Sequence, residues 1–108
     1  MKRLIASICL SMLVSANAYS YTECSRPVKD VWINLNGSNV NVMFSDGGSL
    51  IRKDETQLSQ SQMARFMAVV LTAQATGKNL KVRYPEDGMT CPPTGSTRND
   101  IDGVWIQN

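Results

Sequence analysis

The chain has 108 residues, a formal net charge of +2 and no histidine. The lack of histidine excludes Ser-His and Cys-His nucleophilic sites and most zinc sites. Without the two basic residues at its amino-terminal end, the chain carries nine basic and nine acidic side chains. Such a balance argues against the basic tails and basic helices that bind nucleic acid or anionic membranes.

Residues 1–18 show the features of a bacterial secretory signal peptide. Two basic residues precede an apolar run from Leu4 to Val14, and an Ala-x-Ala cleavage site ends at Ala18. The run is shorter than the roughly 20 apolar residues that span a bilayer. We therefore expect a secreted or periplasmic mature domain at residues 19–108, without a membrane span.

The mature domain keeps two of the three cysteines, Cys24 and Cys91, because Cys9 leaves with the signal peptide. An even number of cysteines in an oxidising compartment predicts one disulfide. A bridge that closes such a long loop stabilises the fold by about 4 kcal/mol in the chain-entropy model. A domain of this size has a modest core and gains from such a bridge or from oligomerisation.

Alternating apolar and polar residues from Val28 to Arg52 predict a three-stranded antiparallel meander. Its turns are expected at Asn36-Gly37, a strong hairpin signal, and at Asp46-Gly47-Gly48. The third strand is expected at residues 49–52, and residues 53–59 read as a polar loop. In the first strand, Val31, Ile33 and Leu35 are predicted to face inward.

A helix is predicted from Gln60 to Thr76, with Gly77 at the position where glycine ends a helix. The period then returns to two, which predicts a strand from Leu80 to Tyr84 and a last strand around residues 101–106. The predicted class is α+β, mainly β: a five-stranded antiparallel OB-like barrel with one helix between strands three and four. A generic α+β sandwich is the alternative.

The helix has more apolar surface than one small sheet can cover. Its apolar side chains fill an arc of about 200°, whereas a helix on a sheet usually buries a stripe closer to 100°. An exposed apolar patch of this kind usually marks an interaction surface. We therefore predict a subunit interface on this helix, or else a helix that the loops at 53–59 and 91–99 cover. The predicted interface residues are Met63, Phe66, Met67, Val70 and Gln74.

No residue pattern supplies a catalytic site. Asp100 and Asp102 lie on the same side of an extended segment, and a solvated strand edge explains them better than an acid–base pair. We therefore predict a protein that is not an enzyme and that needs no metal or cofactor. An enzyme that uses carboxylates alone is one alternative.

The aromatic residues suit sugar binding. A ring stacks on the apolar face of a sugar while polar neighbours bond its hydroxyls. Trp32, Tyr84 and Trp105 are the candidate ligand-binding residues, and alternation directs both tryptophans away from the core. Each tryptophan can equally seal a subunit interface or the end of a barrel.

The segment from Leu71 to Val82 resembles the helix end and following strand of the Shiga toxin B subunit, which has a near-identical S-A-Q-x-T-G-x-x-V-x-I run. The segment from Thr76 to Tyr84 is similar to the T-G-x-x-V-x-I-x-Y run of subtilase cytotoxin and pertussis-like B subunits. The single disulfide of the Shiga toxin B subunit likewise joins a cysteine near the mature amino terminus to one just after that strand.

The resemblance implies an OB fold, a homopentameric ring with the helices lining its pore, and binding to host glycans. It also implies an enzymatic A subunit that docks through its tail into the pore. The glycan-binding residues of these toxins have no counterpart in this chain, and the loop from Cys91 to Asn99 is its own. The competing interpretation is a monomeric periplasmic inhibitor or accessory protein that binds another protein.

Overall fold

The computed structural model describes residues 20–36 and 38–108, so the predicted signal peptide lies outside the described residues. Within these ranges the chain forms six strands and one helix. In chain order they are β1 (Thr22–Arg26), β2 (Val28–Asn34), β3 (Asn39–Phe44), β4 (Ile51–Asp54), α2 (Gln60–Thr76), β5 (Leu80–Tyr84) and β6 (Gly103–Ile106). The predicted class, mainly β with one helix, is confirmed.

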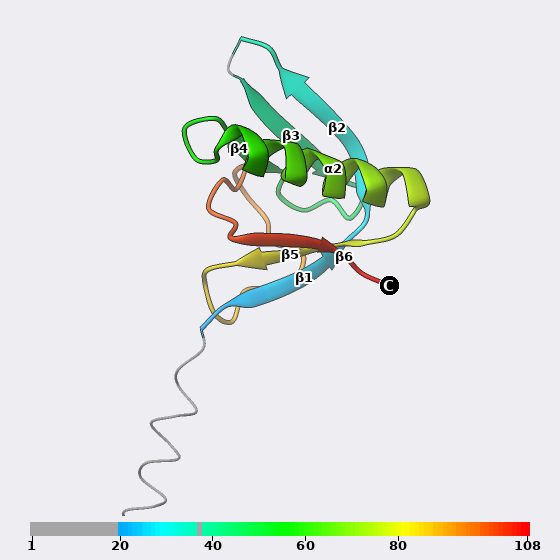
Figure 1. The fold of residues 1–108 in the computed structure, drawn as a ribbon. Helices are drawn as coiled ribbons and strands as arrows, with labels where there is room; N and C mark the ends of the chain where they lie inside the picture. The colour runs from blue at the N-terminus through cyan, green and yellow to red at the C-terminus, as the bar shows by residue number, and fades with distance from the viewer. Residues whose placement is uncertain (1–19, 37) are drawn as a thin grey trace, which may run out of the picture.

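The strands form two antiparallel sheets of three strands each, in the orders β1-β5-β6 and β2-β3-β4. Helix α2 lies across both sheets and packs against β2 of one sheet and β6 of the other (Figure 1). Only Pro27 separates β1 from β2, and proline has no backbone N–H to continue a ladder. One chain segment therefore passes from the first sheet into the second.

The sequence pattern missed β1. Its register with β5 places Cys24 and Arg26 opposite Val82 and Leu80, and both Cys24 and Arg26 are buried. Because arginine is almost never fully buried, an arginine at a core position hides the apolar alternation that marks a strand. The other strands lie within about two residues of their predicted positions; β4 begins at Ile51 rather than at residue 49.

The predicted five-stranded OB-like barrel is not confirmed: the described residues form two three-stranded sheets and no closed barrel. β4 and β6 do not pair, and one parallel bridge joins Ile51 of β4 to Arg98 in the loop that leads to β6. Residues 93–98 run along the boundary between the two sheets, which we call the seam, and act as a strap. Ser49 N donates to Pro93 O (2.7 Å), and Arg98 N donates to Leu50 O (2.8 Å). The Cys24–Cys91 disulfide, which the structure contains as predicted, joins β1 to the beginning of this loop.

Helix α2 has the predicted bounds. Ser59 and Gln62 form a reciprocal capping box at its start, and Gly77 ends it in the left-handed conformation with φ of 69°. Phe66, Val70 and Ala73 face the sheets and are buried. They join a core formed by Cys24, Val40, Val42, Phe44, Ile51, Phe66, Val70, Ala73, Leu80, Val82, Tyr84 and Ile101.

The buried Arg26 organises the seam between the sheets. Its Nε and Nη2 donate to the two carboxylate oxygens of Asp46, each at 2.9 Å, and its Nη1 donates to Ser49 O (2.6 Å) and Tyr84 Oη (2.9 Å). The guanidinium also lies 3.8 Å above the ring of Phe44. The charge is thus fully paired, which is the condition for burying it.

Candidate functional site

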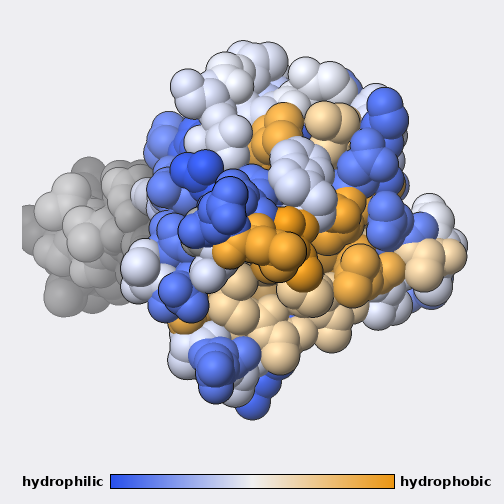
Figure 2. Space-filling view, turned by 90° about the horizontal axis from the view of Figure 1, so that it is seen from above, coloured by the Kyte–Doolittle hydropathy of each residue, from blue (hydrophilic) through white to orange (hydrophobic). Residues whose placement is uncertain are grey.

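Two exposed surfaces could take part in binding. The first, which we call the helix–hairpin face, consists of Ile33 and Leu35 on the β2–β3 hairpin and Met63, Met67 and Leu71 on α2. Leu35 is 87% exposed, and Ile33 and Leu71 are also exposed. Viewed from above, apolar side chains gather in a patch on this part of the molecule (Figure 2).

A groove of about 710 Å³ runs between the hairpin and the first half of α2. Ile33, Leu35, Met63 and Met67 contribute its apolar lining, while Glu55 and other polar residues lie at its end. Ile33 and Leu35 were predicted to face the core, and for them the prediction is wrong: the hairpin extends beyond α2, so no described element covers its end (Figure 1).

The structure divides the predicted interface residues into two groups. Met63 and Met67 are half-buried and lie on the helix–hairpin face. Phe66 and Val70 belong to the core of the subunit itself, so their assignment to an interface is wrong; they point from α2 toward the sheets. Gln74 is exposed, and its Nε2 donates to Lys29 O (2.9 Å), which ties the end of the helix to β2.

The second surface, which we call the aromatic platform, lies on the outer face of sheet β1-β5-β6. Its centre is Arg83, whose guanidinium carbon is 4.4 Å from the ring centre of Tyr21 and 5.5 Å from that of Trp105. Both Nε and Nη2 of Arg83 donate to Glu23 Oε2, at 3.1 and 2.8 Å. This bonding raises the pKa of Arg83 and holds its guanidinium between the two rings.

The platform contains one of the three predicted ligand residues. Trp105 belongs to it and is partly exposed, whereas Trp32 is exposed on β2, in the other sheet. Tyr84 is fully buried and its hydroxyl accepts a hydrogen bond from Arg26, so its assignment as a ligand residue is wrong. Because side chains alternate along β5, the inward direction of Tyr84 places Arg83 outward.

Sequence reasoning did not identify Tyr21, Glu23 and Arg83 as site residues. The alternation in β5 is the only signal that could have pointed to Arg83. Its neighbours follow from the strand register, in which Arg83 lies opposite Glu23 on one side and Gly103 on the other. A register between distant segments cannot be read from local sequence.

Of the two carboxylates weighed as a catalytic pair, Asp100 is engaged in an ion pair. Asp100 accepts two hydrogen bonds from Arg98 (2.9 and 2.7 Å), which lower its pKa. Arg98 also binds Glu86 (2.6 Å). Asp100 is thus an ion-pair partner that stays charged at neutral pH. In residues 20–36 and 38–108, no group of three acidic or cysteine side chains could hold a metal ion.

The sequence matches no protein-family model, and comparisons with curated proteins and with solved structures found no match. Among the described residues, no helix is both long and apolar enough to cross a membrane.

Proposed function

We propose that this protein is a secreted, non-catalytic subunit that assembles into a homopentameric ring and binds glycans, in the manner of the B subunits of bacterial toxins. The observation that carries the proposal is the helix–hairpin face. Exposed apolar patches on soluble domains mark interaction sites, and this one joins a helix to the end of a hairpin. Self-association through identical subunits would cover the face in a closed ring.

The strand order supports the relationship to OB-like B subunits. If β1 and β2 are read as one strand bent at Pro27, five strands follow in the order β4, β3, β2/β1, β5 and β6. The parallel bridge from Ile51 to Arg98 lies at the remaining seam. A partly open five-stranded barrel with a helix between its third and fourth strands is OB-like.

The aromatic platform supports glycan binding. Trp105 and Tyr21 offer ring faces for stacking, and the neighbouring outward residues of the sheet are polar. Arg83 already has a carboxylate partner, so its role in the proposal is to hold the rings in place. Trp32 offers a second stacking surface on the other sheet.

Light scattering after gel filtration of the protein from residue 19 onward tests the assembly. We expect a mass about five times that of the monomer, because a closed ring with identical contacts satisfies every subunit. A monomeric mass would refute the ring and favour the inhibitor or accessory protein, for which pull-down from periplasmic extract is the next experiment. Coexpression with a candidate A subunit would test the second implied partner.

A glycan array tests the ligand. We expect binding by the parent protein and a loss of about fivefold to 150-fold for Trp105→Ala, because stacking on one ring is worth about 1–3 kcal/mol in comparable base–aromatic contacts. Lys29→Ala is the control, since Lys29 is exposed on β2, in the other sheet and outside the aromatic platform. Equal loss in both variants would contradict stacking on Trp105.

A further inference from the structure

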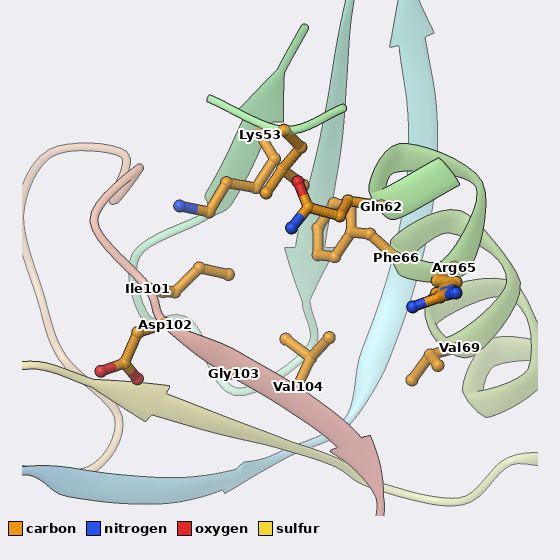
Figure 3. Close-up of a pocket in the computed structure, with 10 residues that line it drawn as sticks. Lys53, Gln62, Arg65, Phe66, Val69, Ile101, Asp102, Gly103 and Val104 are labelled. Atoms are coloured by element: carbon orange, nitrogen blue, oxygen red, sulfur yellow. The ribbon is translucent and has the colours of Figure 1, made fainter. Parts of the chain in front are cut away.

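A small cavity of about 260 Å³ lies between α2 and the start of β6. Figure 3 shows the residues that line it, and among them Leu58 also lines the groove of the helix–hairpin face. Phe66 and Ile101 belong to the core and form its floor, and Leu58, Val69 and Val104 form its walls. A group that enters this cavity would therefore contact the hydrophobic core directly.

The cavity follows from the open side of the fold. Beyond the bridge at Ile51 and Arg98, no strand pairing joins the two sheets within the described residues. Two side chains instead span the gap: Lys53 Nζ donates to Asn99 O (2.8 Å) and Gln57 Nε2 donates to the same oxygen (3.0 Å). The walls are thus held by specific hydrogen bonds.

The polar groups around the cavity are mainly hydrogen-bond donors. Gln62 Oε1 accepts from Ser59 N in the capping box, which leaves the amide Nε2 of Gln62 as a donor. Arg65 lines the cavity and forms no ion pair among the described residues. The carboxylate of Asp102 is turned away from the apolar floor (Figure 3).

We propose that this cavity binds a small apolar carboxylate, with its hydrocarbon end on Phe66 and Ile101 and its carboxylate at Arg65 and Gln62. A cavity of about 150 Å³ lined by apolar residues holds a benzene ring, so this one accommodates a phenyl ring with a short alkyl chain. Guanidinium groups bind carboxylates by charge-assisted hydrogen bonds. The inference goes beyond glycan binding and ring assembly and depends on neither.

An NMR titration of the ¹⁵N-labelled protein from residue 19 onward tests the proposal. The probe is 4-phenylbutyrate, and 4-phenylbutan-1-ol and 4-phenylbutylamine are its neutral and cationic controls. We expect saturable shifts of the amides of Val69, Ile101, Gly103 and Val104 with the carboxylate. We expect about fivefold or greater weakening for both controls, because a charged hydrogen bond is about twice as strong as a neutral one.

Two variants make the test specific. Arg65→Gln should weaken 4-phenylbutyrate about tenfold and leave the alcohol unchanged, while Lys29→Gln, a change of an exposed lysine on β2, should affect neither probe. Val69→Phe should fill the cavity and abolish binding of the carboxylate; a folded spectrum is the condition for using this variant.

Three results would overturn the proposal. The first is the absence of saturable shifts up to about 10 mM, which corresponds to binding weaker than about −3 kcal/mol. The second is equal affinity for the carboxylate and the alcohol. The third is a set of shifts that maps to the helix–hairpin face or the aromatic platform instead. The parent protein and Arg65→Gln decide the matter even if Val69→Phe does not fold.

Discussion

The seam around Arg26 and the helix–hairpin face both depart from the usual distribution of residues, because the seam buries a charged side chain and the face exposes apolar ones. At the seam the Arg26 cation is fully buried, and its three guanidinium nitrogens donate to Asp46, Ser49 and Tyr84. At the helix–hairpin face, Leu35 and Leu71 are exposed, and no described residue covers them. The first region is complete within one chain, whereas the second is the surface at which we propose that another subunit packs.

Because of this difference, we expect changes in the two regions to affect different properties, the stability of the fold in one case and its assembly in the other. Changes at the seam should alter the free energy of unfolding, because they leave buried polar groups unpaired. Changes at the helix–hairpin face should alter the mass in solution and leave the fold intact, because the side chains already contact water there. The predictions below test this separation, from the largest expected effect to the smallest.

Replacing both cysteines, as Cys24→Ala with Cys91→Ala, should have the largest effect. The disulfide closes a loop with a sequence separation of 67 and anchors the strap of the seam. We expect a loss of about 4 kcal/mol in the free energy of unfolding, as the chain-entropy model gives for such a loop. Urea denaturation followed by circular dichroism measures it, and an unchanged midpoint would show that the strap does not depend on the bridge.

Arg26→Ala should cost about 3 kcal/mol, because removing one partner of a buried pair leaves Asp46 and the hydroxyl of Tyr84 without their donor. Arg83→Ala is the matched control: it also removes an arginine from a carboxylate, but on an exposed surface, where solvent screens the pair and a much smaller loss is expected. The same urea experiment compares the two. Equal losses would contradict the contrast between seam and surface.

Acid should weaken the seam through Asp46. Hydrogen bonds from Arg26 lower the pKa of Asp46 below its usual value of 3.8. A depressed pKa contributes stability that is present above about pH 4 and is lost as the pH falls through the lower, folded-state value. We expect the unfolding midpoint to fall as the pH is lowered below about 4, and to fall less steeply in Asp46→Asn.

The pH series contains its own control. Asp100 also has a lowered pKa, caused mainly by hydrogen bonds from Arg98, but it is exposed. Asp100→Asn should therefore change the acid limb less than Asp46→Asn does, since solvent screens an exposed pair. A larger change for Asp100→Asn would place the acid-sensitive pair outside the seam.

Leu71→Glu should have the smallest effect on stability, within about 0.5 kcal/mol, because the side chain is already exposed. On the proposed assembly it should nevertheless reduce the mass to that of a monomer, since a charge would be buried at the subunit interface. Thr72→Glu, on the polar stripe of the same helix, is the matched control. Retention of the parent mass by Leu71→Glu would show that the helix–hairpin face is not the interface.

Local sequence signals predicted much of the fold. Asn36-Gly37, the apolar period of the helix and Gly77 predict the hairpin and the bounds of α2, because each depends on the backbone preferences of a few neighbouring residues. β1 was missed because Arg26 occupies a core position in it. Its burial depends on Asp46 and Tyr84, which lie far away in the sequence.

The candidate sites were less predictable than the fold. The directions of Trp105 and Trp32 follow from strand alternation, and both side chains are exposed as expected. The association of Trp105 with Tyr21, Arg83 and Glu23 follows only from the pairing of β5 with β1 and β6. The inward direction of Tyr84 excludes it from any surface site.

Sequence alone thus determined the number of cysteines in the predicted mature domain, the period of each element, and the positions where the chain turns. These are properties of short segments, set by side-chain type and backbone preference. Tertiary structure decided that a seam joins two sheets without closing them, that Phe66 and Val70 are core residues, and that Ile33 and Leu35 are exposed. Burial depends on which distant element covers a side chain, and periodicity along one segment carries no information about that neighbour.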